Sequence, residues 1–576
     1  MASLLVLIAL AWCAAGDLWT PAAWQRPARY IESDEYNDVL STYATMKAVA
    51  EGDYLPLAWK NISALGAPHT ANWNDWPSIE ELPMFFFGML GKAFGLFAGL
   101  HLSLLLGHVL AALTFYLVAR CSDCNRTWSL VGGWAYGLAP FLFAQSPHHI
   151  TVAYAWHIPL FLLVWRWVAT EPGLAPRTPR FWWAVGIGFL AGLQNVYYTN
   201  ILCQLTLLGA LALFYRNRSW RALFSAGAVV AAAAFAFTLM NLDTWTYRLE
   251  YGPNTRAVVR EPKWLEIYGL KLVDLVVPPM THRGQSFADF ATTHHNASRL
   301  DETVFYTDEG SYLGIVGLAS LTLLAAASVL AVLRRRANDV PREAWQALWI
   351  VLFFLSGGLN PIVGSLGFTL FRSGCRYSVV LLAIALLYAA QRLSGWETRL
   401  VTQSPNHRAR WFFGAAAAAS ALLIFWDQTP RPPTPATVAT ITQQVESDRK
   451  FVAAMENALP RGAMVFQLPI MEYPESPMSH MPPYDHFRPY LYSKTLRFSF
   501  GSVKGRDKWQ QELDAMTPSQ RIEKIKSLGF SAIYLNRNAF SDRGNILEDL
   551  LKRLGYERPP IQSERGDLAC FVLQRD

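Results

Sequence analysis

The sequence predicts a polytopic α-helical membrane protein with about eleven transmembrane helices and a small C-terminal α/β domain. Hydrophobic residues make up 52% of the 576 residues and charged residues only 16%, a balance that is unusual for a soluble enzyme. Apolar runs recur between residues 1 and 426, and a run of about 20 apolar residues is long enough to cross a bilayer. The composition then changes at Thr429.

The predicted spans begin at the first residues of the chain. Residues 1–16 are apolar but lack a basic start, so they are interpreted as a short first span rather than as a signal peptide. Either interpretation places the segment that follows outside the membrane. Ten further spans are expected at residues 100–119, 128–144, 151–169, 182–198, 200–215, 223–240, 312–333, 345–356, 377–390 and 411–426.

Arginine residues determine the predicted orientation. They gather in the short loops after alternate spans, and short basic loops normally stay on the cytoplasmic side. These loops carry Arg120, Arg126, Arg177, Arg180, Arg216, Arg218, Arg221, Arg334, Arg335, Arg336, Arg392, Arg399, Arg408 and Arg410. The segments 17–99 and 241–309 and the C-terminal domain are then outside. The net charge of +7 reports this topology, and nucleic acid is not expected as a partner.

The first outer segment contains two predicted helices. Ser33 can cap a helix whose first turn carries Asp34 and Glu35. Apolar residues then recur at helical spacing as far as Ala50, which predicts an amphipathic helix along the membrane surface. Gly52 is expected to end it. The apolar stretch 83–97 is interrupted by glycines and is expected to be an interfacial or re-entrant helix.

The C-terminal part is predicted to be a separate soluble domain. Residues 1–428 form the expected transmembrane domain and residues 429–576 the α/β domain, joined by a proline-rich linker after Thr429. Helices are expected at 441–458, 508–528 and 546–554, and strands at 463–468, 531–536 and 569–573. Alternating helices and strands are typical of an α/β layer.

The acidic cluster after the first span supplies the candidate catalytic residues Asp34, Glu35 and Asp38. On a helix, Asp34 and Asp38 are one turn apart and face the same way. A carboxylate at the membrane surface can take a proton from an attacking hydroxyl group, or it can help to hold a divalent cation. The alternative is that the acidic residues only favour the start of a helix.

Candidate ligands for an anion lie at other outer span ends. Arg372 and Arg376 lie where a span begins, and guanidinium groups suit phosphate because each can bind two of its oxygens; their alternative role is to reach lipid headgroups. His148 and His149 could bind a phosphate or a sugar, or they could be structural.

Four further residues complete the candidate substrate site. Tyr197 and Tyr198 could contact a sugar or belong to an aromatic belt. Arg256 and Arg260 lie in the long outer segment, and such loops often bind substrate. No metal-binding motif is recognised, and no cofactor is predicted beyond the divalent cation that the acidic cluster leaves open.

Several motifs occur in an order that resembles a known superfamily. They are Ser33-Asp34-Glu35, the apolar stretch 83–95, Ser146-Pro147-His148-His149, Glu309-Gly310-Ser311-Tyr312-Leu313-Gly314, Phe371-Arg372 and Arg376. This order resembles that of the GT-C superfamily of polyprenyl-phosphate-dependent membrane glycosyltransferases, and most of all its YfhO-like bacterial branch. Two departures are the short first span and the lack of a signature for the donor sugar or the acceptor.

The resemblance implies a function and a location. The catalytic acidic residue of the first outer loop falls on Asp34, with Glu35 beside it. The donor would be a sugar on a polyprenyl phosphate, transferred with inversion to a glycan, lipid or protein on the outer face of a bacterial cytoplasmic membrane. The C-terminal domain would then be periplasmic. The alternatives are a transporter or flippase of a lipid-linked glycan, and a non-catalytic scaffold of an envelope polysaccharide assembly.

Overall fold

The computed structural model describes residues 1–30, 38–75, 80–170, 174–298, 309–403, 408–476, 481–506 and 509–573. Within these residues, six helical segments are long and apolar enough to cross a membrane. They are α5 (Leu96–Cys121), α11 (Val196–Asn217), α12 (Trp220–Met240), α16 (Gly314–Leu333), the segment Gly374–Thr402 and α20 (Arg408–Gln428). The chain is therefore a multi-pass membrane protein.

The remaining predicted spans are shorter or interrupted. The first span is α1 (Ala2–Gly16), and the span expected at 128–144 consists of α6 (Arg126–Gly137) and α7 (Pro140–Gln145). Pro140 stands in the first turn of α7, where its missing N–H costs no hydrogen bond. The other short helices of the bundle are α8 (Ile150–Ala153), α9 (Ile158–Val168), α10 (Pro179–Gly192) and α17 (Arg342–Phe354).

The break between α8 and α9 lies inside the protein. Non-helical backbone at membrane depth is tolerated where protein groups satisfy it. The hydroxyl group of Tyr136 donates a hydrogen bond to the Ala155 carbonyl at 3.0 Å, and that of Thr114 donates to the Trp156 carbonyl at 2.5 Å. Two neighbouring helices therefore compensate for the hydrogen bonds that the break removes.

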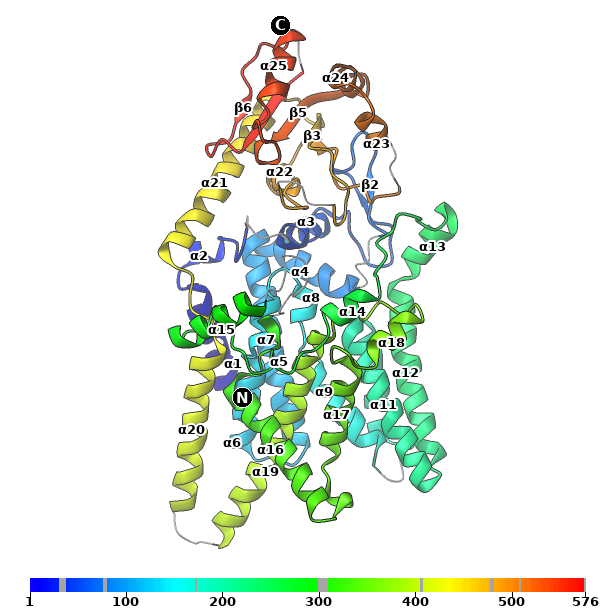
Figure 1. Ribbon diagram of the computed structural model, residues 1–576, viewed down its shortest axis with the longest axis vertical. Coiled ribbons are helices and arrows are strands. Elements are labelled where there is room, and N and C mark those ends of the chain that lie inside the picture. The colour runs from blue at the N-terminus through cyan, green and yellow to red at the C-terminus, as the bar shows by residue number, and fades with distance from the viewer. Residues whose placement is uncertain are drawn as a thin grey trace.

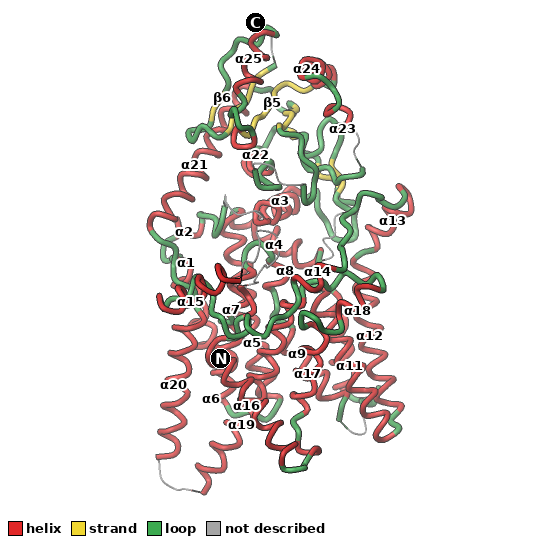
Figure 2. Tube along the Cα trace, in the orientation of Figure 1, coloured by secondary structure: helices red, strands yellow, loops and turns green. Residues whose placement is uncertain are grey.

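The helix bundle has two different ends. Figure 1 shows the C-terminal ends of α16 and α19 (Ser378–Gln403) and the N-terminal end of α20 at the end of the bundle farthest from the C-terminal strands. Arg334 and Arg335 follow α16 there. The long connections between spans and the C-terminal strands gather at the opposite end, and Figure 2 shows how much of this end is loop. We call it the sheet end.

Short helices cover the bundle at the sheet end. They are α2 (Pro21–Trp24), α3 (Asp38–Glu51), α4 (Glu81–Phe94), α13 (Leu242–Tyr251), α14 (Lys263–Ile267), α15 (Gln285–Ser298) and α18 (Asn360–Ser365), with the 3-10 turns η1 (Glu309–Ser311) and η3 (Gly374–Tyr377). A third 3-10 turn, η2 (Ala337–Asp339), lies between α16 and α17. The apolar stretch 83–97 thus falls mostly in α4, a helix of 14 residues.

The prediction of a surface helix after the acidic cluster was correct in position and wrong in environment. Helix α3 begins at Asp38, and Gly52 follows its end with a φ of 92°. It is buried on more than one face, because Leu40, Tyr43, Ala44 and Met46 are all fully covered. It lies between α4 below and α22 (Phe487–Tyr492) above (Figure 1). Packing from two sides therefore replaced the expected contact with a membrane surface.

The C-terminal part forms a five-stranded mixed sheet in the order β4-β3-β5-β7-β6. Its strands are β3 (Met464–Leu468), β4 (Arg497–Phe498), β5 (Phe530–Asn536), β6 (Ile561–Gln562) and β7 (Leu568–Val572). Strands β4, β3 and β5 are parallel, whereas β7 pairs antiparallel with both β5 and β6. The three strands expected from the sequence are present to within one residue.

The helices around the sheet are α21 (Pro435–Ala458), α22, α23 (Trp509–Asp514), α24 (Pro518–Ser527) and α25 (Asn545–Arg553), with the 3-10 turn η4 (Arg537–Ala539). The single helix predicted at 508–528 is thus two helices. Thr517 caps α24 in a capping box with Gln520, and Pro518 stands in its first turn. Both features start a new helix rather than continue the previous one.

The sheet is not packed as an independent domain. One of its faces, with Val465, Tyr534 and Cys570, belongs to the same hydrophobic core as residues of the first outer segment and of α3. That segment forms the β1 (Asn61–Ile62) and β2 (Ala71–Asn72) hairpin, and Leu65 pairs with Phe498 at the sheet edge. The other face, with Phe466 and Ile533, packs on α23, α24 and α25.

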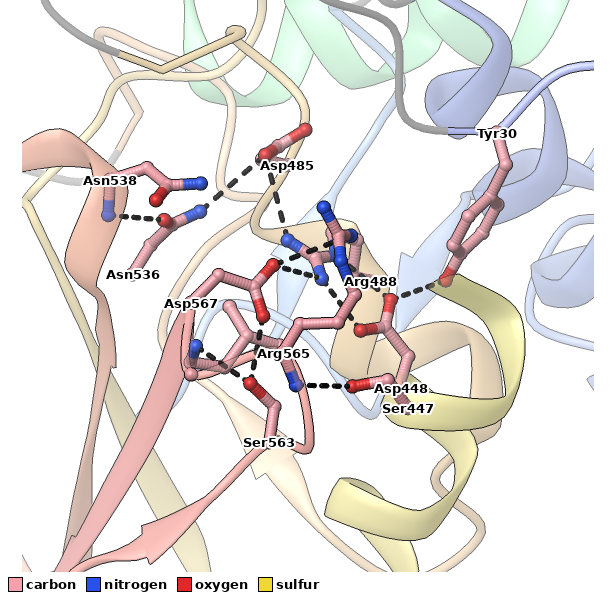
Figure 3. Close-up of polar contacts among 12 residues, drawn as sticks. Tyr30, Ser447, Asp448, Asp485, Arg488, Asn536, Asn538, Ser563, Arg565 and Asp567 are labelled. Carbon is pink, nitrogen blue, oxygen red and sulfur yellow. Dashed lines mark hydrogen bonds and ion pairs between the residues drawn. The ribbon is translucent and has the colours of Figure 1, made fainter. Parts of the chain in front are cut away.

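A buried arginine ties the inner face of the sheet together. Arg488 of α22 donates to both carboxylate oxygens of Asp448 on α21, at 2.8 and 2.6 Å, and to Asp567 at 2.8 Å (Figure 3). Asp485 lies 3.8 Å from the same guanidinium group. All four side chains are buried. We call them the Arg488 cluster.

The Arg488 cluster predicts a pH-dependent stability. Burial raises the pKa of Asp485 to about 6, against the pull of Arg488 and with a contribution from the charges of Asp448 and Asp567. Between pH 4 and 6 the folded protein thus keeps a proton that the unfolded chain has lost, so stability falls as pH rises through this window. We expect Asp485→Asn to stabilise the protein at pH 8 by about 1–3 kcal/mol.

This expectation is checked by the thermal midpoint in detergent at pH 5 and pH 8. The thermal midpoint of the variant should exceed that of the wild-type protein only at pH 8. Asp549→Asn, an exposed carboxylate on α25, is the matched control and should change neither midpoint. An Asp485→Asn protein that is less stable than wild type at pH 8 would contradict the raised pKa.

Candidate active site

The candidate site lies at the sheet end, where α3 begins above the bundle. Asp38 opens α3, and its Oδ2 lies 3.4 Å from Nε2 of His149 in the loop between α7 and α8. The imidazole ring of His148 meets that of His149 edge to face, with centroids 5.0 Å apart. Residues 38 and 149 are remote in sequence, so the fold brings together two segments that the sequence had proposed separately.

Two arginines come from the segment that leads into α19. The guanidinium of Arg376 stacks 4.7 Å above the Tyr197 ring, and that of Arg372 lies 5.3 Å above the Tyr268 ring. Both arginines are half-buried. Their turn fits closely because a Cβ on Gly374 would come within 2.5 Å of the Phe354 carbonyl oxygen. Glycine at this position therefore lets the cationic turn approach the end of α17.

The charge of Arg376 influences the imidazole of His148. The pKa of His148 lies well below its ordinary value, because of burial first and then the positive charges of His149, Arg29 and Arg376. His148 is therefore neutral near pH 7 and acts as a hydrogen-bonding group rather than as a cation. Arg29 and Arg376 come from segments that are far apart in the sequence. The charges of both contribute to lowering the pKa of this one imidazole.

Sequence reasoning missed two residues of the site, Glu80 and Asn195. The Asn195 amide donates a hydrogen bond to Oε1 of Glu80 at 2.7 Å, and its side-chain oxygen accepts one from the Tyr197 N–H. Burial raises the pKa of Glu80 to about 7, although Arg376 lowers it. The available signals were a Glu-Glu pair before an apolar stretch and an asparagine at a span boundary.

Arg256 and Arg260 are already engaged with acidic partners. Both oxygens of Glu475 accept hydrogen bonds from Arg260, at 2.6 and 2.7 Å, and Arg256 pairs with Glu472 at 2.5 Å. These pairs fasten the long outer segment to the loop after β3. Arg260 still lies close enough to Arg372 for its charge to contribute to lowering the Arg372 pKa, after burial.

The two tyrosines of the next boundary differ. Tyr197 faces Arg376, and its hydroxyl group donates to the Leu370 carbonyl at 3.1 Å, so it lies beside the cationic turn. Tyr198 is fully buried and donates to the Val152 carbonyl at 2.5 Å. In this conformation Tyr198 braces the broken α8–α9 region, and its hydroxyl group is directed at protein backbone.

Asp34 and Glu35 lie outside the described residues, as does the predicted cap Ser33. The described flanks of the acidic cluster nevertheless end at the site. Arg29 precedes it and influences His148, and Asp38 follows it and pairs with His149.

The described residues combine aromatic-backed cations, a neutral imidazole and two carboxylates, Asp38 and Glu80. Such a set can bind an anionic group and move a proton beside it. Among the described residues, no group of three histidine, cysteine or acidic side chains is arranged to hold a metal ion.

No family model and no curated protein matches the chain. Among solved structures, it is similar to the arabinofuranosyltransferase AftD from Mycobacteria, with a TM-score of 0.51 and 14% identity, over 100% of this chain and 42% of AftD. It is also similar to ArnT from Cupriavidus metallidurans bound to undecaprenyl phosphate, with a TM-score of 0.41 and 13% identity, over 99% of this chain and 97% of ArnT.

A third similar structure is the Archaeoglobus fulgidus oligosaccharyltransferase in complex with Zn and sulfate. The TM-score is 0.42 and the identity 12%, over 93% of this chain and 68% of that one. The likeness to AftD, over the whole of this chain, defines the class: the protein has the GT-C fold. The resemblance predicted from the sequence is thereby confirmed for the fold, and the YfhO-like branch stays a prediction.

Proposed function

We propose that the protein is a membrane glycosyltransferase that moves a sugar from a polyprenyl-phosphate donor to a glycan, lipid or protein acceptor. The observation that carries this proposal is the convergence of Arg372 and Arg376 with His148, His149 and Asp38 at one end of the bundle. Transfer from a lipid phosphate needs cations for the leaving group and a carboxylate for the attacking hydroxyl.

Each residue has a defined role in this proposal. Arg372 and Arg376 hold the phosphate, because their charges are half-buried and backed by aromatic rings. Neutral His148 donates a hydrogen bond to a phosphate or sugar oxygen. Asp34 accepts the proton of the acceptor hydroxyl group as it attacks the sugar carbon and the phosphate leaves. Inversion of the anomeric carbon follows from such a single displacement.

The proposal also fixes an orientation. With eleven spans and the basic loops in the cytoplasm, the sheet end and the C-terminal sheet face the outside of a bacterial cytoplasmic membrane. AftD is an arabinofuranosyltransferase, and ArnT was solved with undecaprenyl phosphate. The activity of AftD supports a transferase that moves a sugar. The donor sugar and the need for a divalent cation are left open in this proposal.

Arg372→Gln tests the proposed donor site. No carboxylate of a described residue pairs with Arg372, so its removal breaks no ion pair within the described protein. A lost charge-assisted contact to phosphate should raise the donor KM at least about tenfold. The measurement is transfer of a labelled sugar from polyprenyl-phosphate donors by protein in lipid nanodiscs.

The matched control is Arg166→Gln. Arg166 lies in the last turn of α9, where it pairs with exposed Asp123 at 3.0 Å. It should leave the donor KM unchanged. Equal donor KM values for Arg372→Gln and wild type would remove Arg372 from the site. Movement of the lipid-linked sugar across vesicles without any transfer would favour a transporter instead.

A further inference from the structure

The Arg488 cluster contains a contact that its charge balance does not require. Arg488 already pairs with both oxygens of Asp448 through two hydrogen bonds. Asp448 nevertheless accepts a third, at 2.6 Å, from the hydroxyl group of Tyr30 (Figure 3). Tyr30 precedes Asp448 by 418 residues and belongs to the first outer segment. This hydrogen bond therefore joins α21 of the C-terminal part to the N-terminal part of the protein.

Tyr30 is held firmly at this junction. It is 1% exposed, and its ring meets that of Phe97 on α5 edge to face at 6.3 Å. Burial and the neighbouring Asp448 raise its pKa well above the ordinary value, so the hydroxyl group keeps its proton and remains a donor. Its ring packs against Phe97 of the bundle, while its hydroxyl group donates a hydrogen bond to Asp448 of α21.

The residue before Tyr30 acts on the candidate site. Arg29 is one of the charges that influence His148, and its carbonyl accepts a hydrogen bond from the Tyr43 hydroxyl group of α3 at 3.4 Å. A displacement of Tyr30 would move the Arg29 backbone at once, since the two residues are adjacent. The backbone position of Arg29 against α3, the helix that carries Asp38, thus depends on where Tyr30 is anchored.

We infer that Tyr30 is a positioning residue, whose hydrogen bond to Asp448 makes α21 of the C-terminal part hold Arg29 in place at the transfer site. This inference rests on the proposed function. It assigns α21 a role in the reaction although neither Tyr30 nor Asp448 touches the substrate. If the cluster were purely structural, it would stabilise the C-terminal part, and removal of the Tyr30 hydroxyl group would leave kcat unchanged.

Tyr30→Phe tests the inference, because it keeps the ring and leaves the Arg488–Asp448 pair intact. Tyr534→Phe is the matched control. Tyr534 is fully buried beside the same cluster, and its hydroxyl group has no hydrogen-bond partner among the described residues. We expect Tyr30→Phe to lower kcat about tenfold, with an unchanged donor KM and with a Tm that falls by only a few degrees for the one lost hydrogen bond. Tyr534→Phe should change none of the three.

Hydrogen exchange provides a readout that does not need transfer activity. A peptide that carries Arg29 and Tyr30 should exchange faster in Tyr30→Phe than in wild type, while peptides from β5 and β7 keep their protection. Equal exchange of this peptide in both proteins, or an unchanged kcat, would overturn the inference. A wild-type protein without any transfer would reject the proposed function, and exchange would still decide the role of Tyr30.

Discussion

Replacement of Asp34 by asparagine is expected to lower kcat for sugar transfer by about 10²–10⁴-fold, the usual contribution of a general base. Asparagine keeps the size of the side chain and removes its ability to take a proton. The donor KM should change little, because the phosphate contacts come from Arg372 and Arg376. The measurement is turnover of a labelled polyprenyl-phosphate sugar at saturating donor.

Asp38→Asn is the informative comparison. The Asp38 carboxylate is already directed at His149, 3.4 Å away, so its role would be to orient the imidazole. We expect its loss to lower kcat by about tenfold, the effect of one positioning contact. Asp17→Asn, an exposed carboxylate after α1, should have no effect. Full turnover in Asp34→Asn with a large loss in Asp38→Asn would reverse the two assignments.

Local features of this fold could be read from the sequence. Strands β3, β5 and β7 are buried on both faces, and their short apolar runs were predicted to within one residue. The spans that were misjudged as continuous contain prolines, such as Pro140 in α7. Pro518 in the same way separates α23 from α24. These prolines indicate where one helix ends and the next begins, whereas apolar composition alone predicts one continuous helix.

Contacts between remote segments could not be read from the sequence. Asn195 and Glu80 are 115 residues apart, and Tyr30 and Asp448 are 418 apart. No periodicity links such pairs, since each depends on how whole elements pack. The sequence likewise marked α3 as a surface helix because one face is apolar, but its other face is covered by α22 of the C-terminal part. The shared core between the two parts thus escaped prediction.

The same packing creates a second buried charge cluster, which should dominate stability. Lys60 of the first outer segment pairs with Glu81 of α4 at 2.7 Å and with Asp243 of α13, and all three side chains are at most 2% exposed. Asn74 donates a hydrogen bond to Asp243 at 2.6 Å and accepts one from the Lys60 N–H at 2.8 Å. A single ammonium group therefore faces two buried carboxylates, and its charge can balance only one of them.

Lys60→Met is expected to destabilise the protein by about 3–5 kcal/mol, since both carboxylates would lose their buried cation. The loss should be larger at pH 8 than at pH 6. Burial already raises the pKa of Glu81 to about 7 although Lys60 lowers it, so stability falls as pH rises through 7, and removing Lys60 raises that pKa further. The thermal midpoint in detergent at the two pH values measures this.

Two variants separate lost charge pairing from lost packing. Lys450→Met removes an exposed lysine that pairs with Glu564 and should shift the midpoint little. Lys60→Met combined with Asp243→Asn should recover part of the loss, because one buried charge is then removed with its partner. Glu80, the neighbour of Glu81, bonds to Asn195 in the candidate site. If Lys60→Met is as stable as Lys450→Met, the Lys60 cluster does not secure that end of α4.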